Sequence, residues 1–107
     1  MVRPLTRWYL MATIDDLLIL HRVRLLAAVA RHHAHNLRVF GSVARGEERP
    51  DSDVDFLVDF ESDASLLDLI GLKEDFEAVL GRPADIVTAE GVSPFLRDRI
   101  LKEAVPL

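Results

Sequence analysis

The chain contains no cysteine among its 107 residues. This absence excludes a disulfide framework, a thiol nucleophile and any zinc site with sulfur ligands. It also fits a reducing compartment, and we expect the protein to be cytoplasmic. Half of the residues are apolar and 29% are charged, a composition typical of one globular domain with a single hydrophobic core.

A basic face and a long apolar run are absent as well. The formal net charge is −5, whereas proteins that bind DNA or RNA usually carry a basic patch, so we expect no direct nucleic-acid binding. No apolar stretch reaches the ~18 residues that a membrane-spanning helix needs, and we expect no membrane association. The start, MVRPLTRWYLMA, is too interrupted for a signal peptide. We assign residues 1–12 to an N-terminal extension and residues 13–107 to one domain.

Three segments have the periodicity or the end signals of a helix. The first begins near Thr13 with a sequence like a capping box and continues to about Arg31. The second covers 64–80, although Gly71 inside it costs about 1 kcal/mol relative to alanine. The third begins at Ser93-Pro94, a capping serine with proline at the first helical position, and continues to about residue 104.

Short alternating segments predict three strands, at residues 37–40, 53–60 and 84–88. The expected order is therefore helix, strand, strand, helix, strand, helix. Such an order indicates a small α/β or α+β domain built in layers.

The strand at 53–60 carries the most informative pattern. Asp53 and Asp55 lie two residues apart, so their side chains project from one face of the strand. The opposite face is apolar and consists of Val54, Phe56, Val58 and Phe60. Two carboxylates in this arrangement can bind a hard divalent cation such as Mg²⁺ or Mn²⁺. Asp85, at the start of another strand, supplies a third carboxylate if the two strands are neighbours.

The Gly41-Ser42 pair gives the carboxylates a chemical context. Gly41 ends a strand and allows a tight turn, and Ser42 begins a possible helical turn whose backbone N–H groups and hydroxyl suit a phosphate. A phosphate-binding turn beside a metal-binding strand is the equipment of metal-assisted phosphoryl or nucleotidyl transfer.

The acidic stretch allows two other interpretations. Alignment of Asp51, Asp53 and Asp55 with an EF-hand loop puts Phe56 where glycine is needed and Ser62 where the bidentate glutamate belongs, so we reject a calcium loop. Alternatively, the acids merely solubilise an edge strand. The position of Gly41-Ser42 favours the metal site.

Gly41-Ser42, ten further residues and then Asp53-Val54-Asp55 resemble the signature of the polymerase-β-like nucleotidyltransferase superfamily. The longer run GSVARGEERPDSDVDFLV, followed by ADIVT and SPFLRDRILKEAVPL, resembles its minimal nucleotidyltransferase group. The resemblance covers about residues 14–107. It implies a nucleotidyltransferase fold, a small mixed sheet flanked by helices.

The resemblance also implies roles for particular residues. Asp53, Asp55 and Asp85 would be the catalytic carboxylates that bind two Mg²⁺ ions, with Mn²⁺ as a possible substitute. Gly41 and Ser42 would hold the triphosphate of ATP. Arg45 matches the family's A-R-G segment and would assist there, although a surface arginine explains it nearly as well.

By the same resemblance, the protein is an antitoxin that transfers AMP from ATP to a hydroxyl, expected to be a tyrosine, of a partner HEPN-type RNase toxin. The chain has no room for an acceptor-binding second domain, so we expect a complex with the toxin. Two alternatives stay open: an antitoxin that neutralises its toxin by binding alone, and a small-molecule nucleotidyltransferase of the aminoglycoside type.

Overall fold

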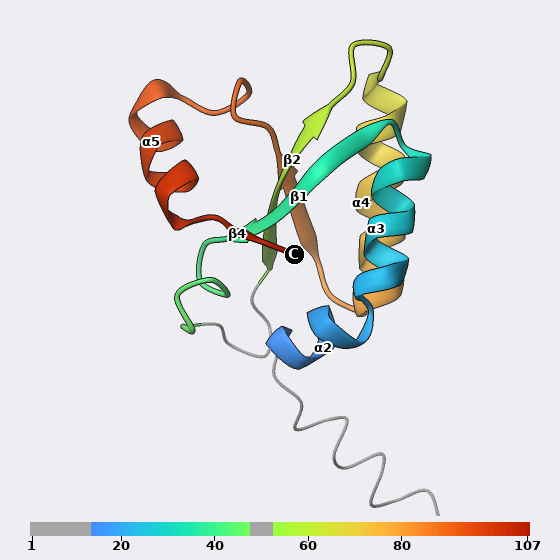
Figure 1. Ribbon diagram of the computed structural model, residues 1–107, viewed down its shortest axis with the longest axis horizontal. Coiled ribbons are helices and arrows are strands. Elements are labelled where there is room, and N and C mark those ends of the chain that lie inside the picture. The colour runs from blue at the N-terminus through green and yellow to red at the C-terminus, as the bar shows by residue number, and fades with distance from the viewer. Residues whose placement is uncertain (1–13, 48–52) are drawn as a thin grey trace, which may run out of the picture.

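The computed structural model describes residues 14–47 and 53–107. Four strands form one mixed sheet in the order β3-β2-β1-β4 (Figure 1). The elements, in chain order, are α2 (Ile14–Leu20), α3 (Arg22–Arg31), β1 (Ala34–Phe40), β2 (Val54–Phe60), α4 (Leu66–Leu80), β3 (Ala84–Val87), α5 (Pro94–Glu103) and β4 (Val105–Pro106). The predicted fold class, a small mixed sheet flanked by helices, is confirmed.

The sheet combines both kinds of strand pairing. β1 pairs antiparallel with β2 and with β4, whereas β2 and β3 run parallel. A parallel pair needs a crossover connection, and α4 supplies it between β2 and β3. The crossover brings together the beginnings of β2 and β3, which are the segments that contain Asp55 and Asp85.

One face of the sheet is packed against α3 and α4, and Figure 1 shows α5 on the other side of the sheet. On the predicted apolar face of β2, Val54, Phe56 and Val58 are fully buried, but Leu57 on the opposite face is fully buried as well. Phe56 meets Phe76 of α4 edge-on, with ring centroids 4.6 Å apart. Because β2 alternates, Asp55 is directed away from this core.

The first predicted helix is divided into two. α2 ends at Leu20, and His21 lies between it and α3 with φ −103° and ψ 13°, outside helical geometry. No proline or glycine marks this break in the sequence. Thr13, where we placed the helix start, and the extension at 1–12 lie outside the described residues.

The strand predictions also needed correction. β1 begins at Ala34, three residues before the predicted start, and its register with β2 shifts between His35 and Arg38. The sequence reasoning missed β4, a two-residue strand that pairs with Arg38 and Val39. A strand this short that contains a proline has no alternation to detect.

Gly71, the expected weak point of α4, has a packing role. A Cβ built on Gly71 would lie 2.6 Å from Cε1 of His32. The His32 ring crosses α4 at this position and its Nε2 lies 2.6 Å from Asp75 Oδ2. Glycine therefore lets the end of α3 approach α4 closely.

No helix among residues 14–47 and 53–107 is long and apolar enough to cross a membrane.

Candidate active site

The three predicted carboxylates lie at the beginnings of two neighbouring strands. Asp55 of β2 and Asp85 of β3 are partners in the parallel register, so their side chains leave the sheet side by side. Asp53 immediately precedes β2 and is exposed, as is Asp85, whereas Asp55 is half-buried. The structure thus makes Asp55 and Asp85 neighbours, which the sequence reasoning could state only as a condition.

The electrostatics of this group are those of crowded negative charge. The pKa of Asp55 is raised from 3.8 to about 6, first by burial and then by the charges of Asp85 and Asp53. Arg45 opposes this shift but does not cancel it. Carboxylates that repel one another in this way suit a divalent cation, which removes the repulsion and accepts oxygen ligands.

Gly41 follows the last residue of β1 and lies beneath the Asp55 carboxylate. Its φ is +76°, a left-handed conformation that favours glycine. A Cβ built on Gly41 would collide with Asp55 Oδ2. Both the backbone conformation and the lack of a side chain therefore bring the turn close to the carboxylates.

The expected helical turn after Gly41 is present as a single turn. Arg45 N–H donates to the Gly41 carbonyl (N···O 3.1 Å), and Glu47 N–H donates to the Ser42 carbonyl (2.8 Å). Val43 is buried in the core and anchors the turn, while Ser42 is half-buried. The turn returns Arg45 toward the carboxylates, where its charge acts on Asp55.

Glu103, the last residue of α5, also belongs to this site, and the sequence reasoning missed it. Its Oε2 accepts the Gly41 N–H (2.9 Å) and its Oε1 accepts an N–H of Arg45 Nη1 (2.6 Å). The Arg45 hydrogen bond is the main reason that the pKa of Glu103 is lowered. A contact that spans 62 residues leaves no local pattern that could have revealed it.

A comparable contact holds the beginning of β3. Ala84 is fully buried, and its N–H donates to Glu77 Oε2 of α4 (2.9 Å) while its carbonyl accepts from Lys73 Nζ (2.7 Å). Lys73 and Glu77 also pair with each other at 3.0 Å. Because β3 is an edge strand, the side chains of Lys73 and Glu77 satisfy the backbone groups of Ala84 that a further strand would otherwise bond. They thereby fix the residue before Asp85.

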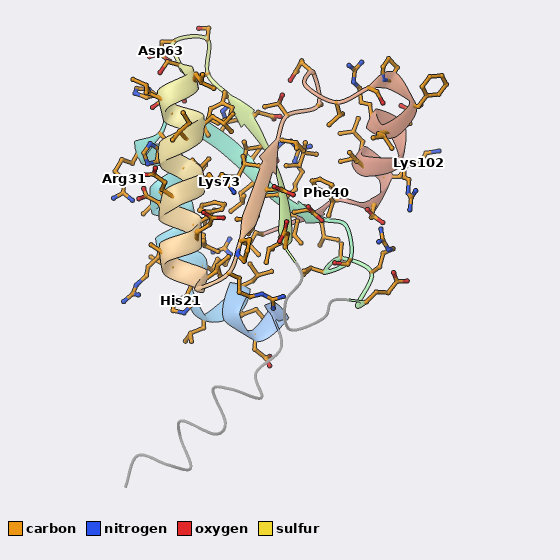
Figure 2. The ribbon with its side chains drawn as sticks, turned by 180° about the vertical axis from the view of Figure 1, so that it is seen from behind. His21, Arg31, Phe40, Asp63, Lys73 and Lys102 are labelled. Carbon is orange, nitrogen blue, oxygen red and sulfur yellow. The ribbon has the colours of Figure 1, made fainter. Side chains whose placement is uncertain are left out.

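A second set of possible ligands lies at the far end of β2. Among the described residues, ligand atoms of His33, Glu61 and Asp63 lie within 4.8 Å of one another, and all three residues are exposed. Figure 2 shows Asp63 far from Phe40, the residue that precedes Gly41. This set is separate from the predicted metal site and we assign it no role.

Comparison of the chain with models of protein families defines the class of protein. The model of the nucleotidyltransferase domain family matches residues 23–107. The chain therefore belongs to the nucleotidyltransferase domain family.

Particular relatives narrow this class. The chain is 43% identical over 82 residues to a provisionally named protein adenylyltransferase of Methanocaldococcus jannaschii, with 77% of this chain and 88% of the relative covered. It is 40% identical over 92 residues to protein adenylyltransferase MntA of Thermococcus cleftensis, with 86% and 90% covered.

Solved structures agree on the fold. A structure described provisionally as a minimal nucleotidyltransferase superposes with a TM-score of 0.75 at 50% identity, covering 85% of this chain and 95% of that one. The crystal structure of a toxin–antitoxin with AMP-PNP superposes with a TM-score of 0.66 at 16% identity, covering 78% and 68%. At that identity the second likeness concerns the fold alone.

Proposed function

We propose that this nucleotidyltransferase transfers AMP from ATP to a hydroxyl group of a partner protein. The observation that carries the proposal is the in-register pair Asp55–Asp85 beside the Gly41 turn. This arrangement supports the proposal, because nucleotidyl transfer requires cation-binding and phosphate-binding groups next to each other.

The metal part of the proposal rests on the donor set. Asp53, Asp55 and Asp85 offer only carboxylate oxygens, which Mg²⁺ prefers, and Mn²⁺ accepts the same ligands. Bound there, one or two ions would neutralise charge on the phosphates and polarise the α-phosphoryl group. The raised pKa of Asp55 supports the need for a cation at this position.

The remaining roles follow from exposure and position. Asp85 is exposed on edge strand β3, so an acceptor hydroxyl can reach it and lose its proton there. The acceptor oxygen forms a bond to the α-phosphorus, and the bond from this phosphorus to the diphosphate breaks. Ser42 and Arg45 hold the departing diphosphate through hydrogen bonds and charge.

The acceptor is proposed from the relatives. Two relatives at 40% identity or more bear the name protein adenylyltransferase, and two structures with the same fold are described as toxin–antitoxin structures. These names support the proposal that the chain is an antitoxin that forms a complex with its toxin. That the toxin is of the HEPN type and is modified on a tyrosine hydroxyl is what the resemblance to the minimal nucleotidyltransferase group implies, and we propose it on that ground.

The test is incubation of the chain with its toxin, Mg²⁺ and ATP labelled on the α-phosphate. We expect label on the toxin from the wild-type chain and none from D53A/D55A. D59N is the matched control, because Asp59 lies on the same strand but pairs with Arg38 at 2.9 Å.

Two outcomes would contradict the enzymatic proposal. If no label reaches the toxin and D53A/D55A still neutralises it, the chain acts by binding alone. If label passes to a small alcohol or an antibiotic without any partner protein, the acceptor is a small molecule.

A further inference from the structure

Glu103 ties the end of α5 to the turn that we propose binds the triphosphate. Its side chain is 16% exposed and accepts two hydrogen bonds, one from the backbone N–H of Gly41 and one from the guanidinium of Arg45. The two groups that it contacts, Gly41 and Arg45, are both among the residues predicted to hold the nucleotide. Its position therefore bears on the proposed site more than a surface ion pair would.

The Gly41 contact completes the edge of the sheet. The β4 side of β1 is occupied at Leu37, whose carbonyl accepts the Leu107 N–H (3.0 Å), and at Val39, which pairs with Val105. By alternation, the Gly41 N–H is directed to the same side, beyond the last residue that β4 can cover. The Glu103 carboxylate accepts this N–H in place of a strand and so fixes the turn at its first residue.

The Arg45 contact fixes a guanidinium. Arg45 is bonded through Nε to Glu47 (2.9 Å) and through Nη1 to Glu103 (2.6 Å). The Glu47 side chain is 63% exposed and the Glu103 side chain only 16%, so the bond to Glu103 is the better shielded from solvent. A guanidinium has five N–H donors and these two bonds use two of them, which leaves donors for a phosphate.

From these contacts we infer that Glu103 is a positioning residue for ATP binding. It holds the Gly41-Ser42 turn and directs the Arg45 guanidinium, without itself binding the nucleotide. This inference rests on the proposed function, since it takes the turn as the triphosphate site.

The experiment compares E103A and E103Q with D98N, a control that removes an acid from an exposed position of the same helix. In AMP transfer we expect E103A to raise the KM for ATP about tenfold, as for loss of a charge-assisted hydrogen bond, with kcat nearly unchanged. E103Q should raise KM only about threefold, because its amide oxygen still accepts the Gly41 N–H, whereas its amide nitrogen is a donor and cannot accept from Arg45. D98N should match the wild type.

A double-mutant cycle tests whether Glu103 acts through Arg45. We expect the loss of affinity of R45A/E103A for a fluorescent, non-hydrolysable ATP analogue with Mg²⁺ to be smaller than the sum of the two single losses, because Glu103 and Arg45 share one contact and only the Gly41 contact of Glu103 remains to be lost in R45A. Fully additive losses would overturn the inference. An unchanged KM for ATP in E103A would also overturn it, because the ion pair would then have no effect on binding. A lower KM would overturn it as well, because Glu103 would then compete with the nucleotide.

Amide hydrogen exchange separates this inference from the proposed function. In nucleotide-free protein, E103A should accelerate exchange at Gly41 about tenfold or more, with E103Q closer to the wild type. This measurement needs neither ATP nor an acceptor. Unchanged exchange at Gly41 would overturn the inference, whereas accelerated exchange in a chain that transfers no AMP would overturn only the proposed function.

Discussion

Two glutamates make the same local contact at two strand ends, in different surroundings. Glu103 accepts the N–H of Gly41 and pairs with Arg45, whereas Glu77 accepts the N–H of Ala84 and pairs with Lys73. Ala84 is fully buried and Lys73 is also bonded to its carbonyl, so the Glu77 contact closes an edge. Gly41 is half-buried and Arg45 faces a group of carboxylates, so the Glu103 contact shapes a site.

The comparison shows how one chemical device serves two purposes. At Ala84 the carboxylate satisfies a buried backbone group, and its loss should mainly affect stability. At Gly41 it orients groups that we propose meet a ligand, and its loss should mainly affect binding. Substitutions at and around the two contacts test this division.

Substitution of Gly41 should have the largest effect. G41A places a Cβ against the Asp55 carboxylate in a left-handed conformation, so the turn must shift. A displacement of about 1 Å costs about 100-fold in activity, and we expect a loss of this order in AMP transfer. G46A is the matched control: its φ is +72°, but no atom of the described residues lies within 4 Å of the added Cβ. If G46A lost as much activity as G41A, backbone strain rather than the carboxylate contact would explain the effect.

Substitution of Glu77 should separate the two contacts. E77A leaves the buried Ala84 N–H without its acceptor, and we expect the melting temperature to fall by about 5 °C with little change in the KM for ATP. E77Q keeps an acceptor and should recover most of the loss. The measurements are thermal unfolding and steady-state kinetics, set beside E103A. A rise in KM as large as that of E103A would show that the two contacts do not divide stability from binding.

The raised pKa of Asp55 allows a test of the carboxylate group that lies near the Glu103 contact. The folded pKa of Asp55, about 6, lies above the ordinary 3.8, so the folded state binds this proton more tightly and stability falls as pH rises between about 4 and 6. In EDTA at pH 7.5, D55N should therefore be more stable than the wild type by about 1–2 kcal/mol after allowance for solvent screening, and equal near pH 4.

The same urea-unfolding series gives a metal readout. Mg²⁺ should stabilise the wild type at pH 7.5 and D55N much less, because binding to the folded state alone raises stability by mass action. A D55N protein that is less stable than the wild type in EDTA at pH 7.5 would contradict the charge-crowding account.

Gly71 offers the smallest effect, away from both contacts. G71A gains about 1 kcal/mol of helix propensity but forces the His32 ring to move away from Asp75, and we expect a net loss of about 1 kcal/mol. The kinetics of AMP transfer should be unchanged. The variant H32A lacks the imidazole ring, so adding G71A to it should no longer lower the stability. If H32A/G71A were still less stable than H32A, the loss would have another cause.

Much of the scaffold could be predicted from local patterns. Alternation along β2 correctly put Val54, Phe56 and Val58 on a buried face and Asp55 on the other, although Leu57 on the Asp55 face is fully buried too. Ser93-Pro94 marked the start of α5 to the residue. The roles of Asp53, Asp55, Asp85, Gly41, Ser42 and Arg45 stay predictions, which the variants above address.

What the sequence could not reveal depends on distant contacts. Whether Asp85 neighbours Asp55 is decided by the pairing of β2 with β3, and the place of Glu103 by how α5 returns to β1. The short strand β4 depends on its pairing with β1, and no local signal marks the break at His21.

The in-register pair Asp55–Asp85 has a consequence for how the site can change during evolution. Neighbouring strands lie about 4.8 Å apart, a spacing set by backbone hydrogen bonds and not by side chains. The separation of these two carboxylates is therefore inherited from the sheet, and drift elsewhere in the sequence can hardly alter it. A slip of β3 by one residue would turn Asp85 to the opposite face, so the carboxylate pair is gained or lost as a whole.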